Sequence, residues 1–253
     1  MLKKRVIPIL LLKGNRLVKG KNFTNHIDTG NPSTAIRVYS AQDADELIFI
    51  NIERKTDSFD NLTNLLREAA KECFMPLTVG GGISNLSQIE SLIASGADKV
   101  ILTTAALDSP DLISKAAALF GSQAIVVGLD YKILDNRPCL HSECGSSLSS
   151  VDFYKFVSEL ASLGAGELYL SSISRDGAMS GYDLDTAKSI KDLTQLPIIL
   201  SGGAGNFMHL ADALNLTNVS AVACASLFHF GDNNPIRARS YLRMQGIPMR
   251  KLK

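Results

Sequence analysis

Glycine-rich turns follow two apolar segments of the chain, at positions where a phosphate group could bind. The sequence "GGG" occupies residues 80–82, and "GGAG" occupies residues 202–205. Glycine lets backbone N–H groups approach a phosphate closely, and a following helix N-terminus adds a favourable partial positive charge. Either turn could also be a tight connection without a ligand, but in both cases the next apolar segment ends in small or hydroxyl-bearing residues. With the glycine-bearing loop at 174–181, the residues predicted to bind phosphate are Gly81, Gly82, Thr104, Gly177, Gly202, Gly203, Ala225 and Ser226.

A carboxylate and a lysine are the candidates for proton chemistry. Asp130 directly follows the apolar segment "AIVVGL". A carboxylate at the end of a barrel strand is well placed to act as a general acid or base, although a single Asp there can also cap a loop. Lys19 lies in the segment 13–31, which is long enough to close over a site as a lid. The alternative interpretation of Lys19 is a solvated surface charge. We predict Asp130 and Lys19 as the catalytic residues.

These candidates require a scaffold that brings the ends of several strands together. Helical periodicity is found over residues 62–73, over 86–93 behind a predicted N-cap at Asn85, and over 153–161 before a predicted C-cap at Gly164. Eight apolar segments have the composition of strands that are buried on both faces, at residues 5–10, 46–51, 77–81, 99–103, 124–130, 167–172, 197–203 and 221–226. Eight βα units in a chain of 253 residues predict an α/β fold, a (β/α)8 TIM barrel forming one domain over 1–253. A doubly wound sheet is the alternative.

The two halves of the chain resemble each other. "PLTVGGGISN" at 76–85 matches "PIILSGGAGN" at 197–206, and "DELIFINI" at 45–52 matches "GELYLSSI" at 166–173 with the same offset of 121 residues. Such duplication is typical of a twofold half-barrel repeat, with halves at roughly 1–120 and 121–253. Within this repeat, Leu11 is the counterpart of Asp130.

Four charged residues stand at or next to the starts of predicted strands: Arg5, Glu46, Lys99 and Glu167. Strand starts face the bottom of a barrel, which normally serves stability. The four could be ordinary solvated charges. Two acids and two bases near the axis could also form a closed ring of ion pairs, which is costly to bury unless the charges satisfy one another. We interpret them as a plug or gate.

Composition excludes several classes of protein. The net charge is +1 and no apolar run approaches the roughly 18 residues that span a bilayer, so we expect neither nucleic-acid nor membrane binding. Basic residues followed by "VIPILLL" resemble a secretion signal, but the run is short, Pro8 interrupts it and no cleavage site follows. We therefore expect a cytoplasmic protein. "CLHSEC" at 139–144 lacks a second cysteine pair, so we predict no metal, and we predict no cofactor.

The chain resembles, over nearly its full length, the cyclase subunit of imidazole glycerol phosphate synthase. The resemblance implies a (β/α)8 barrel that receives ammonia from a separate glutaminase subunit, in a heterodimer. It implies that the four strand-start charges form the ammonia gate, that Asp98 and Tyr39 lie at the partner interface, and that Lys19 is the functional lysine of a mobile loop. The matching stretches are "RVIP" (5–8), "RLVKG" (16–20), "DEL" (45–47), "TVGGGI" (78–83), "GADKV" (96–100), "FGSQA" (120–124), "GAGE" (164–167), "RDG" (175–177), "SGYD" (180–183), "SGGAG" (201–205) and "FHF" (228–230).

Three positions depart from the family pattern. The resemblance implies two catalytic aspartates at the ends of strands one and five, but only Asp130 is present, because the first position is Leu11. Asn51 and Thr103 replace an Asp and an Asn at two further strand ends. Leucine cannot exchange a proton, so a mechanism that uses two carboxylates cannot run unchanged.

With these departures, the chain resembles a paralogous branch of the family that is associated with bacterial surface polysaccharides, such as lipopolysaccharide O-antigen. There, the barrel and its glutaminase supply ammonia for an acetamidino group on a sugar. The resemblance to that branch implies a third, ATP-using amidotransferase and a phosphorylated or nucleotide-sugar substrate. Two alternatives remain open: a genuine cyclase of histidine biosynthesis with a relocated acid, and a non-catalytic scaffold that binds a phosphorylated ligand or partner.

Overall fold

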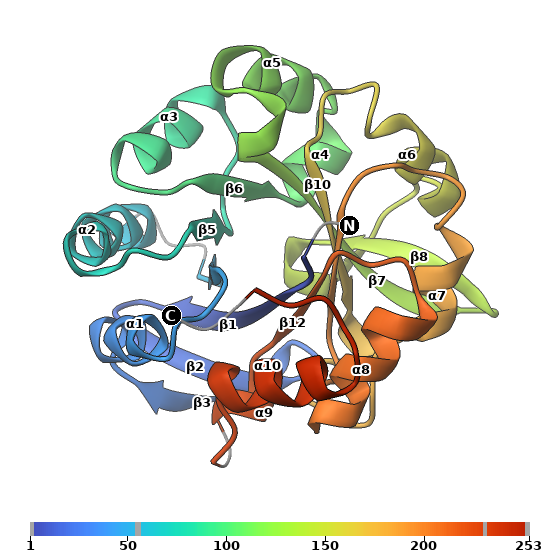
Figure 1. The fold of residues 1–253 in the computed structure, drawn as a ribbon. Helices are drawn as coiled ribbons and strands as arrows, with labels where there is room; N and C mark the ends of the chain where they lie inside the picture. Colours follow the sequence, from blue (N-terminus) through green and yellow to red (C-terminus); the bar gives the residue numbers. More distant parts are fainter. Residues whose placement is uncertain (1–2, 54–56, 230–231, 251–253) are drawn as a thin grey trace.

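Eight parallel strands close into a barrel at the centre of the molecule (Figure 1). The computed structural model describes residues 3–53, 57–229 and 232–250. The strands follow the order β10-β11-β12-β1-β4-β5-β6-β7, and pairing of β7 with β10 closes the circle. This closure confirms the predicted (β/α)8 barrel and excludes the open doubly wound sheet. The barrel strands are β1 (Arg5–Lys13), β4 (Leu47–Asn51), β5 (Leu77–Gly80), β6 (Lys99–Leu102), β7 (Ile125–Leu134), β10 (Glu167–Ser172), β11 (Ile198–Ser201) and β12 (Ala221–Cys224).

Helices surround the barrel because each presents an apolar stripe to it (Figure 1). The predicted cap of α3 is confirmed, since Asn85 Oδ1 accepts a hydrogen bond from the Gln88 N–H at 3.0 Å. No helix among the residues described is long and apolar enough to cross a membrane. The α-helices are α1 (Pro32–Ala41), α2 (Asp57–Glu72), α3 (Leu86–Ala94), α4 (Thr104–Asp108), α5 (Asp111–Phe120), α6 (Phe153–Glu159), α7 (Leu184–Ser189), α8 (Phe207–Leu216), α9 (Ser226–His229) and α10 (Pro235–Met244), and the 3-10 turns are η1 (Ser122–Ala124), η2 (Glu143–Gly145) and η3 (Ile173–Arg175).

The helix predicted over 153–161 is confirmed as α6, although the regular helix ends at Glu159. Gly164 adopts a left-handed backbone, with φ of 96°. Its N–H donates to the Ala161 carbonyl at 3.1 Å, and the N–H of Ala165 donates to the Leu160 carbonyl at 3.1 Å. These two hydrogen bonds are the pattern of a glycine C-cap, so the predicted cap at Gly164 is confirmed at the end of the turn that follows the helix.

Two antiparallel extensions rise from the barrel. Strands β2 (Arg16–Lys21) and β3 (Thr24–Gly30) continue from β1, and strands β8 (Arg137–Ser142) and β9 (Ser147–Leu148) continue from β7. The segment 13–31, expected to be a long loop, is therefore mostly a β-hairpin. Strands β1 and β7 are counterparts in the proposed half-barrel repeat, which remains a prediction from the sequence.

Apolar side chains also fill the barrel interior. Packed side chains are usual inside an eight-stranded barrel. A packed layer of side chains fills the interior in this conformation, since Ile7, Ile48, Val126 and Ile199 are completely buried. We call this set the interior layer: Ile7, Ile9, Ile48, Ile101, Val126, Tyr169, Ile199, Ala221 and Ala223. It separates the two ends of the barrel.

Candidate active site

A cavity of about 600 Å³ opens at the carboxyl ends of the barrel strands. This is the face on which TIM-barrel enzymes carry their active sites. All eight residues predicted to bind phosphate line the cavity: Gly81, Gly82, Thr104, Gly177, Gly202, Gly203, Ala225 and Ser226. The structure therefore brings these residues together, and phosphate binding itself stays a prediction.

The glycines of the cavity have different structural roles. Gly82 has a left-handed backbone, with φ of 72°, and open space where a Cβ atom would lie. At Gly203, with φ of 110°, a Cβ atom would overlap the carbonyl oxygen of Gly181. Gly82 thus leaves its backbone open to a ligand, whereas Gly203 is required by contact between two loops.

Asp130 lies near the C-terminal end of the barrel section of β7 and faces the cavity. No hydrogen bond to its carboxylate is found among the residues described. Removal from water, together with the negative charge of Asp176, raises the pKa of Asp130 from 3.8 to about 7. Because both protonation states are populated near neutral pH, Asp130 can give or take a proton there.

Lys19 is buried rather than solvated, so the surface-charge interpretation was wrong. Its Nζ lies 2.7 Å from Asp176 Oδ1, and only 2% of the side chain is exposed. The backbone N–H of Asn22 donates to the Asp176 carbonyl at 2.9 Å. The hairpin β2–β3 is therefore fastened to the loop that follows β10, over the cavity.

Asp176 is the residue that the sequence reasoning missed. Its Oδ2 atom is buried and has no hydrogen-bond partner among the residues described. Its charge acts on Asp130, and its other oxygen holds Lys19. One signal was available, since Asp176 stands in the glycine-bearing loop after the sixth strand that was already a candidate for binding.

Substituting Gly177 with Ala is expected to detach the hairpin from this loop. A Cβ atom there would overlap the carbonyl oxygen of Gly20, and the backbone φ of 69° already disfavours a side chain. Limited proteolysis within residues 13–30 should become at least about tenfold faster, corresponding to an opening equilibrium shifted by about 1.4 kcal/mol.

Gly82→Ala is the matched control for Gly177→Ala. Its φ of 72° imposes a similar backbone strain, but no atom lies within 4 Å of the added carbon. Cleavage of the hairpin should be unchanged in this variant. Equal cleavage in both variants would mean that strain alone, and not the contact with Gly20, matters.

The positions that depart from the family pattern also line the cavity. Leu11 contributes only an apolar surface. Asn51 Oδ1 accepts a hydrogen bond from the Glu53 N–H at 3.0 Å, which makes it part of the loop structure. Thr103 precedes α4 without a side-chain cap. Asp130 and Asp176 both line the cavity and lie close enough for the charge of Asp176 to act on Asp130.

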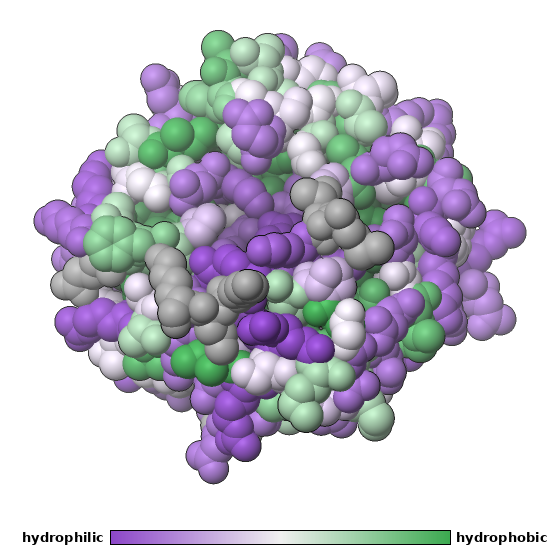
Figure 2. Space-filling view, in the orientation of Figure 1, coloured by the Kyte–Doolittle hydropathy of each residue, from purple (hydrophilic) through white to green (hydrophobic). Residues whose placement is uncertain are grey.

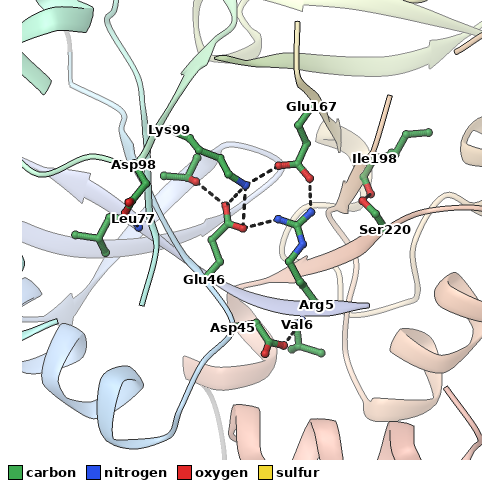
Figure 3. Close-up of polar contacts among 11 residues, drawn as sticks. Arg5, Val6, Asp45, Glu46, Leu77, Asp98, Lys99, Glu167, Ile198 and Ser220 are labelled. Atoms are coloured by element: carbon green, nitrogen blue, oxygen red, sulfur yellow. Dashed lines mark hydrogen bonds and ion pairs between the residues drawn. The ribbon is translucent and has the colours of Figure 1, made fainter. Parts of the chain in front are cut away.

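The four strand-start charges form a closed ring at the opposite end of the barrel, as predicted. Figure 3 shows them pointing toward one another. Arg5 contacts Glu46 at 2.5 Å and also pairs with Glu167. Lys99 Nζ lies 3.2 Å from Glu46 and 2.8 Å from Glu167. Hydrophilic side chains gather at the centre of this face (Figure 2). The alternative of separate solvated charges was wrong, and the role as an ammonia gate stays a prediction.

The two residues expected at a partner interface differ in exposure. Asp98 is exposed beside the ring, and its Oδ2 accepts a hydrogen bond from the Leu77 N–H at 2.8 Å. Tyr39 is only 6% exposed and packs against Phe228 with ring centroids 6.4 Å apart. Most of its ring packs in the core, and the expectation that Tyr39 and Asp98 lie at a partner interface stays a prediction.

The cysteine–histidine segment lies on β8 and the turn after it. His141 Nδ1 is 3.0 Å from the Cys139 carbonyl oxygen, and Cys144 Sγ is 4.0 Å from the Ile52 carbonyl oxygen. Within the described ranges, no three His, Cys, Asp or Glu side chains are grouped so as to hold a metal.

The closed parallel barrel and the cavity at its strand ends define an enzyme-like (β/α)8 scaffold. The chain belongs to the histidine biosynthesis protein family, whose model matches residues 5–234. The match includes both hairpins, the cavity and the ring of charges. This family membership is consistent with the resemblance to the cyclase subunit, and it does not specify the particular reaction.

Proposed function

We propose that this protein is a cyclase-like amidotransferase subunit that takes ammonia from a glutaminase partner and delivers it through the barrel for acetamidino-sugar formation. The observation that carries the proposal is the closed ring of Arg5, Glu46, Lys99 and Glu167 on the barrel axis. Partly buried ion pairs are weak contributors to stability, since desolvation offsets much of their attraction. A ring built from residues at or next to the starts of four strands is therefore better explained as a gate.

The interior layer determines which species can pass. The lining of the cavity includes Ile9, Ile101, Tyr169 and Ala223 from this layer but none of the four ring residues. Passage therefore requires side chains of the layer to move. An ammonium ion would lose its hydration among these apolar side chains at a large cost, whereas neutral ammonia would not. The proposed cargo is neutral ammonia.

The cavity supports delivery better than cyclisation of the family's substrate. Leu11 occupies the position where the cyclase resemblance implies a catalytic Asp, so one of the two carboxylates expected to transfer protons is missing. Conversion of an N-acetyl group to an acetamidino group needs activation of an amide oxygen, which we assign to a separate ATP-dependent amidotransferase. We propose a cytoplasmic complex of the barrel, a glutaminase and this third component, with a phosphorylated or nucleotide-sugar substrate.

Turnover of the histidine-pathway ribonucleotide with free ammonia tests the proposal. We expect little turnover by the wild-type chain and a gain of about 10²–10⁴ in Leu11→Asp, which restores a positioned acid or base. Leu11→Asn is the matched control, since it adds polarity of similar size without a titratable group. Robust wild-type turnover would reject the sugar role and support a histidine-pathway cyclase.

One observation favours that second candidate. Asp176 lies close enough to raise the pKa of Asp130, so the cavity does hold two interacting carboxylates. If Asp176 is the relocated acid, Asp176→Asn will abolish a wild-type cyclase activity. Absence of both glutaminase stimulation and ammonia transfer in the reconstituted complex would instead indicate a non-catalytic scaffold.

A further inference from the structure

We propose that the top of the barrel interior contains a binding site for ammonium, formed by the Asp130 carboxylate and the hydroxyl groups of Tyr169, Ser171 and Ser201. This inference deepens the proposed function by naming where the cargo is held. The inference rests on the proposed function only for the source of the ammonia, because ammonium from bulk solution can also occupy the site.

Strand register places the four residues together. Ser171 on β10 is the register partner of Asp130 on β7 and of Ser201 on β11. Neighbouring strands lie about 4.8 Å apart, and side chains two residues apart on a strand share a face. Tyr169 therefore projects inward with Ser171, and its hydroxyl donates to Ser201 Oγ at 2.9 Å. All four line the cavity.

The site lacks a cationic partner. The three hydroxyl-bearing side chains are at most 7% exposed. No described residue hydrogen-bonds to the Asp130 carboxylate, although buried carboxylates are normally paired. The nearby cation, Lys19, is paired with Asp176 Oδ1, and Asp176 Oδ2 is buried without a hydrogen-bond partner. Two carboxylates thus face the region, and the lysine near them is paired with Asp176.

Ammonium matches this group of acceptors. It carries four N–H donors, and carboxylate and hydroxyl oxygens can accept them. Tyr169 is also a member of the interior layer, so the site begins where that layer ends. Neutral ammonia leaving the layer meets the protonated form of Asp130. The O–H bond of the carboxyl group breaks, an N–H bond forms on the nitrogen lone pair, and an ammonium carboxylate pair results.

Carbon-13 NMR of the isolated chain labelled at the aspartate side-chain carboxyl carbon tests this site. Ammonium chloride is titrated against sodium chloride at constant ionic strength, and Asp130→Asn assigns the signal. We expect a saturable change of the Asp130 signal with ammonium and a lower apparent pKa of Asp130 in its presence. Identical titrations with the two salts would overturn the proposal.

Tyr169→Phe should weaken ammonium binding about tenfold, equivalent to about 1.4 kcal/mol, because it removes one hydrogen bond to a charged group. Tyr182→Phe is the matched control, since the buried hydroxyl of Tyr182 donates instead to the Ala223 carbonyl at 3.1 Å. The affinity of this variant for ammonium should not change. Unchanged affinity in Tyr169→Phe would overturn the assignment of its hydroxyl. Because no glutaminase is present, failure of this binding is distinct from failure of ammonia delivery.

Discussion

Substitution of Glu46 with Gln is expected to lower the free energy of unfolding by about 3 kcal/mol, the lower end of the range for breaking a buried ion pair. The Glu46 side chain is 2% exposed and accepts hydrogen bonds from Arg5, Lys99 and Thr78. Neutralising it leaves two cations to share Glu167. Because the Arg5 and Lys99 side chains are 24% and 20% exposed, partial hydration keeps the loss below the upper end of the range.

Urea denaturation followed by circular dichroism measures this loss. Asp28→Asn is the matched control, since it removes the same charge from an ion pair with Arg16 in which both side chains are about half exposed. We expect no measurable change in that variant. A loss in Glu46→Gln as small as that of the control would show that the ring is screened by solvent and does not behave as a buried network.

Charge balance within the ring gives the same prediction a second readout. The double variant Glu46→Gln with Lys99→Met removes one charge of each sign and leaves the pair of Arg5 and Glu167. We expect it to recover about 1 kcal/mol or more relative to Glu46→Gln alone, because residues in one network couple by roughly 0.5–3 kcal/mol. Strictly additive losses would argue against a closed ring.

Substitution of Asp130 with Asn is expected to stabilise the fold by about 2 kcal/mol at pH 8 while removing its proton chemistry. The pKa of Asp130 is raised from 3.8 to about 7 by burial, and further by the charge of Asp176. Without any reduction for solvent, this rise in pKa makes ionisation of Asp130 in the folded chain less favourable by roughly 4 kcal/mol. Because the side chain faces the cavity, solvent reduces the expected gain to about half.

The pH dependence of the Asp130→Asn gain follows from the direction of this change. Between pH 3.8 and about 7, the unfolded chain releases the proton of Asp130 while the folded chain retains it. Stability contributed by this group therefore falls as pH rises through that window and is constant above it. Asn cannot ionise, so the gain should be present at pH 8 and mostly absent near pH 4.5.

Denaturation of wild type and Asp130→Asn at pH 8 and 4.5 tests this expectation. The ammonia-dependent activity of the complex should fall by about 10²–10⁴ in the same variant, a typical loss for one positioned acid or base. A gain of stability together with a loss of activity would show that the fold keeps Asp130 in an energetically unfavourable state because function requires it. An equal stability difference at both pH values would mean that Asp130 is ionised normally in the folded chain.

The sequence by itself determined the barrel and the contents of its two ends. Strands buried on both faces must be continuously apolar, so each of the eight could be recognised locally. Parallel strands in a closed barrel put their starts at one end and their finishes at the other. The ring of charges and the grouping of Gly82, Thr104, Gly203 and Ser226 around one cavity follow directly from that geometry.

Only the tertiary structure decided how the charged side chains are paired and buried. Lys19 and Asp176 are 157 residues apart, and their contact depends on the hairpin β2–β3 folding back over the loop after β10. The raised pKa of Asp130 depends on its burial and, to a smaller extent, on that same loop, and the Tyr39 ring packs against Phe228 near the other end of the chain. Local sequence patterns report which side chains share a face of one element. They do not report distances between distant segments, and these distances set the electrostatics of the cavity.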